Sequence, residues 1–165
     1  MVAHARLALA LLAVMVLAGC NEKEPSDEQA IAAVEAAQDN KPPVQPIVPQ
    51  AILYPDITQN SLHGTGCAFV AEGGGMGAVL LAQDERAYIK VEGSIVALAS
   101  DAGSARMPNG SWSRYTGKEY ALVIAAQGTA IPASDADKFG GTLVISDRFE
   151  RPVYQASGNF QCRTI

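Results

Sequence analysis

From Thr65 to the C-terminus, the sequence is a series of short apolar runs that alternate with polar residues and are separated by turn-forming residues. The last run is the clearest, because every second residue faces the same way: Tyr154, Ala156, Gly158, Phe160 and Cys162. A period of two residues is typical of a β-strand with one buried face. Several short strands at this spacing favour an antiparallel sandwich or a small barrel. We therefore predict a mostly β domain over residues 51–165, a length sufficient for one core.

The same reading predicts the individual strands and turns. Glu92-Gly93 is typical of a tight hairpin turn, because glycine accepts a positive φ. The glycine-rich residues 72–77 lack the Gly-Lys-Ser/Thr of a phosphate-binding loop, so we interpret them as another turn. Residues 126–140 are predicted to form a long connection. Strands are expected at 65–70, 78–82, 86–91, 94–99, 110–115, 120–125, 142–146 and 153–162.

Residues 1–19 have the layout of a secretory signal, with the basic Arg6, an apolar run over residues 7–16 and small residues before a cleavage point. The apolar run is too short for a ~30 Å hydrocarbon core, which requires ~20 residues. Leu17-Ala18-Gly19-Cys20 resembles the bacterial lipobox, in which the cysteine receives diacylglycerol and becomes the new N-terminus. The resemblance implies a lipoprotein whose lipidation site is Cys20, carrying fatty acids such as palmitate.

The residue after the lipidated cysteine directs sorting in bacterial lipoproteins of the enteric type. Here it is Asn21 and not Asp, which by this resemblance implies the outer membrane, with the protein facing the periplasm. The alternatives are ordinary secretion and a plain transmembrane anchor.

The number of cysteines predicts one disulfide in a compartment that permits oxidation. The chain has three, and if Cys20 carries the lipid, Cys67 and Cys162 remain to form one structural disulfide. Such a bond would join the two ends of the β domain. The alternative is a reactive Cys67 thiol paired with His63, although no motif marks the orienting residue that such a pair requires.

Residues 20–50 are predicted to be a lipid anchor and flexible tether. Ser26-Asp27-Glu28-Gln29 fits a capping box, and the Ala-rich residues 30–38 favour a helix. Residues 41–50 contain four prolines, which exclude a helix and favour an extended polyproline spacer.

The charge of the chain limits its partners. The sequence has 12 basic and 17 acidic residues, and cleavage before Cys20 would remove Arg6 and no acid, leaving a net charge of about −6. No stretch is basic enough to attract a nucleic acid backbone. We therefore expect contact with the membrane through the N-terminal lipid and a possible protein partner in the envelope.

No pattern in the sequence marks a catalytic site. Paired carboxylates, a nucleophile elbow, a phosphate loop and zinc-type ligand spacing are all missing from the sequence. We predict no cofactor, no metal and a non-catalytic role in binding or envelope maintenance. The alternative from another class is a periplasmic hydrolase, since catalytic residues need not be adjacent in sequence.

A lipobox, a linker and a small antiparallel barrel with a cysteine in an early and in the final strand together resemble the membrane-bound inhibitors of C-type lysozyme. Residues 110–115, Gly-Ser-Trp-Ser-Arg-Tyr, look like the Ser-containing segment of that family, which ends in Arg-Tyr. In the family a Ser and a Lys enter the lysozyme cleft and engage its catalytic carboxylates, which implies binding roles for Ser113 and Lys118. The sequence lacks the family's aromatic-rich stretch before the Lys, and Lys118 follows Tyr115 closely.

Overall fold

The computed structural model describes residues 26–39, 41–132 and 137–164. The chain divides into two compact units, residues 1–42 and residues 43–165. The first unit contains helix α2, Asp27–Asp39. Its N-terminus has the expected capping box: the Gln29 amide donates to Ser26 Oγ at 3.4 Å, and the Ser26 amide donates to Gln29 Oε1 at 3.3 Å. Among the described residues, no helix is long and apolar enough to cross a membrane.

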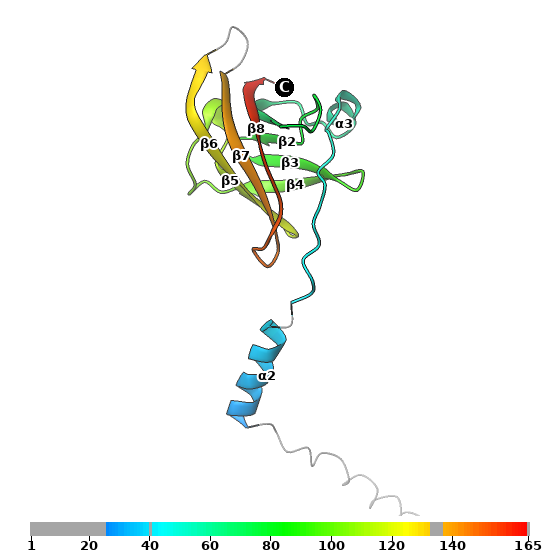
Figure 1. Cartoon of the computed structure of the whole chain (residues 1–165), viewed down its shortest axis with the longest axis vertical. Helices are drawn as coiled ribbons and strands as arrows, with labels where there is room; N and C mark the ends of the chain where they lie inside the picture. The colour runs from blue at the N-terminus through cyan, green and yellow to red at the C-terminus, as the bar shows by residue number, and fades with distance from the viewer. Residues whose placement is uncertain (1–25, 40, 133–136, 165) are drawn as a thin grey trace, which may run out of the picture. The chain divides into compact units, whose positions relative to one another are not determined.

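The second unit is a closed antiparallel barrel of eight strands, each paired with the next along the chain (Figure 1). Pairing of the first strand with the last closes the barrel, with Cys67 opposite Cys162 and Phe69 opposite Phe160. The fold is therefore the barrel alternative of the two architectures predicted. The strands are β1 Thr65–Ala71, β2 Leu80–Gln83, β3 Arg86–Val91, β4 Ser94–Ser100, β5 Arg114–Thr116, β6 Tyr120–Pro132, β7 Asp137–Asp147 and β8 Pro152–Thr164.

Side chains fill the inside of the barrel. The Phe160 ring lies between those of Phe69 and Phe139, with ring centroids 4.6 and 5.0 Å away. An eight-stranded barrel has an interior just wide enough to be filled by side chains. Burial of these large apolar groups is the main force that stabilises the closed barrel. Other fully buried residues are Leu80, Ala82, Ala87, Ile89, Leu122, Leu143 and Ile145.

Alternation predicts most strands well but fails over residues 126–140. Strand β3 and the Glu92-Gly93 turn with positive φ at both residues are as predicted. The predicted long connection is wrong, because β6 continues to Pro132 and β7 begins at Asp137. Backbone hydrogen bonds hold this extension together across a register irregularity between Gln127 and Ile131. Those bonds do not depend on an apolar pattern, so the small and polar residues gave no strand signal.

The predicted strand over 110–115 is shorter in the structure. Its first residues belong to a loop, residues 101–113, which contains a 3₁₀ turn at Pro108–Gly110. Only the end of the predicted run pairs as β5, with β4 and β6.

The segment before the first strand belongs to the barrel unit. The Ile47 amide donates to the Val153 carbonyl in β8, and the Gln50 amide donates to the Lys90 carbonyl in β3. Pro49 is buried, and Ile47 packs against the core. The segment therefore crosses the barrel end that carries the β1–β2, β3–β4, β5–β6 and β7–β8 turns. The barrel unit begins at residue 43, eight residues before the expected boundary at 51.

The outside of the barrel is covered on one side. Helix α3, Tyr54–Gln59, and the residues around it bury Ile52, Leu62 and Leu81 against the outer face of the first strands. The Lys90 ammonium donates to Asp56 Oδ1 at 2.7 Å and ties this cover to β3. None of the residues that the structure describes forms such a cover over the outer face of β5, β6 and β7, where Val123 of β6 is 38% exposed.

Candidate functional site

The predicted disulfide is present. Cys67 and Cys162 are joined with an S–S distance of 2.02 Å, and both are fully buried. The alternative of a reactive Cys67–His63 pair is wrong, because Cys67 has no thiol and the His63 ring instead meets Tyr54 edge-on at 6.4 Å. Cys20, the predicted lipidation site, lies outside the described residues.

The loop 101–113 closes the barrel end near this disulfide. The buried Ser111 hydroxyl donates to the Pro108 carbonyl at 2.9 Å and lies 3.1 Å from Cys67 Sγ. The loop thus separates the disulfide from solvent at the end of the barrel opposite the segment that contains Ile47.

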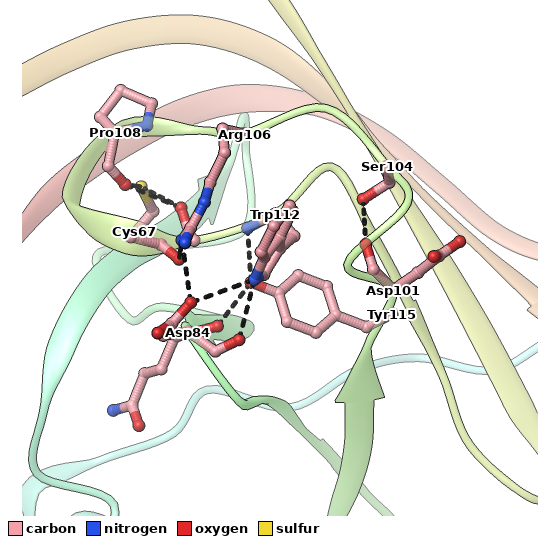
Figure 2. Close-up of polar contacts among 11 residues, drawn as sticks. Cys67, Asp84, Asp101, Ser104, Arg106, Pro108, Trp112 and Tyr115 are labelled. Atoms are coloured by element: carbon pink, nitrogen blue, oxygen red, sulfur yellow. Dashed lines mark hydrogen bonds and ion pairs between the residues drawn. The ribbon is translucent and has the colours of Figure 1, made fainter.

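A cluster of three residues ties the loop to the β2–β3 turn (Figure 2). An Arg106 guanidinium nitrogen donates to Asp84 Oδ1 at 2.8 Å, and the Trp112 indole donates to the Asp84 carbonyl at 2.9 Å. The Arg106 guanidinium also lies over the Trp112 ring, 4.0 Å from its centroid. Since each group is already satisfied by its neighbours, we interpret the cluster as a structural clamp on the loop.

Tyr115 extends this network into the core. Its hydroxyl donates to the Gln83 carbonyl at 2.7 Å and accepts a hydrogen bond from the Trp112 amide at 2.8 Å. Burial raises the pKa of Tyr115 to about 12, and the bond from the Trp112 amide acts in the opposite direction. The phenol therefore stays neutral and works as a structural donor.

The structure does not bring Ser113 and Lys118 onto one protruding loop. Ser113 precedes β5, and its hydroxyl accepts a hydrogen bond from the Ala105 amide at 3.0 Å. Lys118 is exposed in the turn after β5, at the other end of that strand. Of the two residues, Lys118 is exposed and Ser113 is half-buried.

Lys118 lines a hollow of about 410 Å³ on the uncovered outer face. Thr116 of β5, Ala121 of β6 and Ser146 of β7 lie opposite one another in register, and their short side chains form its floor. Residues of the β5–β6 and β7–β8 turns complete the lining. The hollow is lined by Arg114, Thr116, Gly117, Lys118, Tyr120, Ala121, Val123, Ser146, Asp147, Arg148 and Glu150; we call it the β5–β7 groove.

Positive charge predominates in the β5–β7 groove. Arg114, Lys118 and Arg148 have no carboxylate partner among the described residues, and Glu150 is the one acid of the lining that makes no ion pair there. The other acid, Asp147, is paired with Arg151 at 2.7 Å. Desolvation alone would raise the pKa of Asp147, but hydrogen bonds from the Arg151 side chain and from the Arg151 and Phe149 amides outweigh it and lower the pKa.

A second hollow, of about 400 Å³, lies beside the β2–β3 turn. Its lining carries both signs of charge: Arg86 is basic, whereas Asp84 and Glu85 are acidic. Asp84 is held by Arg106, and the Gln83 side chain donates to the Leu62 carbonyl at 2.8 Å. Asp84 and Gln83 are therefore already engaged within the protein. No described residues form a group of three or more metal-type ligands here or elsewhere.

Sequence reasoning identified Lys118 but not its neighbours Arg114 and Arg148. Arg114 is four residues before Lys118, whereas Arg148 is 30 residues after it. Only the pairing of β5 with β6 and of β6 with β7 brings Arg148 to the same surface. Short side chains at outward positions of successive strands could have indicated the groove. Recognising them requires the strand register, which shows that these residues lie side by side.

Protein-family models were compared with the chain, and none matches. The comparisons with curated proteins and with solved structures found no match either. The resemblance to lysozyme inhibitors therefore stays a prediction.

Proposed function

We propose that the chain is a lipid-anchored protein of the bacterial envelope, held at the outer membrane by Cys20 and facing the periplasm. Its barrel is a non-catalytic binding module. The proposal for the anchor rests on the signal-like residues 1–19 and the lipobox-like Leu17-Ala18-Gly19-Cys20.

The observation that supports binding is the β5–β7 groove. The interior of the barrel is filled, so a ligand has to meet the outer surface. There, one face is covered by α3 while the other carries a hollow with cations that no carboxylate of the described residues neutralises. Polar groups that a fold leaves without partners beside a hollow are a starting hypothesis for a binding site.

The experiment for the anchor is metabolic labelling with radioactive palmitate, followed by separation of inner and outer membranes. The wild-type chain should incorporate label and sediment with the outer membrane. Cys20→Ser should lose the label and accumulate as precursor. Equal labelling of the two proteins would refute the lipoprotein assignment, and labelled protein in the inner membrane would refute the sorting alone.

Inhibition of a C-type lysozyme is the second candidate, supported by Lys118, which is exposed and forms no ion pair with the described residues. The engaged hydroxyl of Ser113 leaves Lys118 as the single residue through which the family's mode of binding would act. A charge-assisted contact of Lys118 with a catalytic carboxylate would contribute about 1.5–3 kcal/mol, so Lys118→Ala should weaken inhibition ~10- to 100-fold. Absence of inhibition at micromolar concentrations of the chain would exclude this candidate.

A further inference from the structure

The floor of the β5–β7 groove is built to admit a small ligand. Thr116 and Ser146 flank Ala121 in one cross-strand row, so two hydroxyl groups border a space that no long side chain fills. Among the described residues, neither hydroxyl makes a side-chain hydrogen bond that would occupy it. Hydroxyl groups at such a position can donate to a ligand oxygen.

Three cations surround this floor from different elements. Arg114 lies on β5, Lys118 in the β5–β6 turn and Arg148 in the β7–β8 turn. The Arg148 guanidinium lies over the Phe149 ring at 5.0 Å, which restrains its position without neutralising its charge. Asp147 does not offset these cations, because Arg151 neutralises it; Glu150 offsets one of them.

The groove lining is richer in positive charge than the rest of the molecule. The chain has a net charge of −5, while the lining of the groove, with Asp147 paired, has three positive charges and one negative. Two further acids, Glu119 and Glu92, act on Tyr120 at the edge of the groove. A hollow lined by one sign of charge concentrates ligands of the other sign. The three cations therefore gather on a part of the outer surface that α3 does not cover.

We propose that the β5–β7 groove binds the phosphoryl group of a small phosphate-bearing ligand. The inference rests on the proposed binding function and names its ligand class. Guanidinium groups bind phosphate oxygens through paired hydrogen bonds, and lysine binds them as a point charge. Two or three cations with two hydroxyls match the several oxygens and the double negative charge of a phosphate monoester better than the two oxygens of a carboxylate.

The test is calorimetric titration of the full chain, purified in a neutral detergent, with inorganic phosphate. We expect a Kd of about 0.1–1 mM, as befits a few exposed ionic contacts. Lys118→Gln and Arg148→Gln should each weaken binding about five- to tenfold. Lys138→Gln is the matched control: it removes the same charge from β7, eight residues before Ser146 or about 26 Å along the strand, and should change the Kd less than twofold.

A second variant separates the groove from the general charge of the surface. Ser146→Leu keeps every charge but fills the floor from an outward strand position, so it should abolish binding while circular dichroism and the unfolding midpoint stay as in the wild type. Any of three results would overturn the proposal. The first is unchanged phosphate affinity in Ser146→Leu, and the second is an equal loss of affinity in Lys118→Gln and Lys138→Gln. The third is no binding at about 20 mM phosphate, a concentration well above the expected Kd of about 1 mM or less. Acetate binding as tight as phosphate would overturn it as well.

Soluble short-chain lipids identify the source of the phosphoryl group. Competition with phosphate by dihexanoyl phosphatidylglycerol at or below the phosphate concentration would support a lipid headgroup, and phosphate binding that this lipid does not reduce would support a soluble ligand. Equal competition by zwitterionic dihexanoyl phosphatidylcholine would overturn the assignment, because that lipid has no net negative charge. Failure of these titrations leaves palmitate labelling of Cys20 unaffected, so the ligand and the anchor are tested separately.

Discussion

Tyr115 is the residue on which the loop at one barrel end depends. Its side chain is fully buried, and its hydroxyl joins the Gln83 carbonyl of β2 to the Trp112 amide of the loop 101–113. Trp112 and Arg106 then hold Asp84 from the loop side. A buried donor and acceptor that lose their partner cost free energy, so one hydroxyl group links the barrel core to the cover of the disulfide.

We expect Tyr115→Phe to lower the free energy of unfolding by about 1–3 kcal/mol at neutral pH, because the Gln83 carbonyl and Trp112 amide lose their partner. The deficit should shrink in alkali. A phenol whose pKa is raised to about 12 in the folded protein stabilises fully below the unfolded pKa of about 10, and this contribution disappears as the pH rises toward 12. At pH 11 the wild type should have lost about 1.4 kcal/mol that Tyr115→Phe cannot lose.

Urea unfolding at pH 8 and pH 11 measures both effects. The pKa values of Tyr120 and Tyr154 are also raised by burial, but those residues are common to both proteins and cancel in the comparison. Tyr54→Phe is the control, because Tyr54 is 72% exposed. A deficit of Tyr115→Phe that stays constant between the two pH values would contradict this account.

At the scale of the element, glycines let the strands fit around the phenylalanine cluster. A Cβ at Gly158 of β8 would overlap with the Val70 carbonyl oxygen and lie 2.7 Å from the Phe69 ring. Gly140 of β7 differs, because the nearest atom to a Cβ there is 4.0 Å away. Small residues beside large ones are how a narrow barrel accommodates aromatic rings.

We predict that Gly158→Ala lowers the free energy of unfolding by about 3 kcal/mol, since backbone and ring both have to move. Gly140→Ala should be neutral or stabilising by up to about 1 kcal/mol, because it only reduces the freedom of the unfolded chain. Urea unfolding of the two variants gives the comparison. Equal stabilities would show that β8 can shift away from β1 at no cost.

At the scale of the whole molecule, the disulfide lies on the seam where β1 meets β8. The two cysteines are 95 residues apart in the sequence, so the bond encloses the chain from β1 to near the end of β8. In the chain-entropy model a loop of this length contributes about 4–5 kcal/mol, which is a large part of the about 5–15 kcal/mol expected for a domain.

Reduction should therefore lower the free energy of unfolding by about 4–5 kcal/mol. Urea unfolding of the full chain with and without reductant provides the measurement, and a Cys67→Ala, Cys162→Ala double variant, unaffected by reductant, is its control. Before reduction, alkylation of the folded chain should modify neither of the two cysteines. Substantial modification of Cys67 without reductant would show that the bond is absent from the protein in solution.

Strand identity was largely predictable from the sequence. The alternation in residues 86–91 and 153–162 fixes which side chains face inward, because successive residues of any strand point to opposite faces whatever the partner. The same holds for the Glu92-Gly93 turn and the Ser26–Gln29 capping box, each a matter of a few adjacent residues. The pairing of Cys67 with Cys162 followed from counting, once Cys20 was assigned to the lipid.

Closure of the barrel, the length of β6 and β7, and the β5–β7 groove were decided only by the tertiary structure. Backbone hydrogen bonds extend β6 to Pro132 through residues without an apolar pattern, and Ile47 lies against Val153 through a contact with no local signal. Arg114, Lys118 and Arg148 share a surface because β5, β6 and β7 pair in one register. Alternation is a local property of the chain. Register and closure depend instead on which pairing of distant strands gives the most favourable free energy.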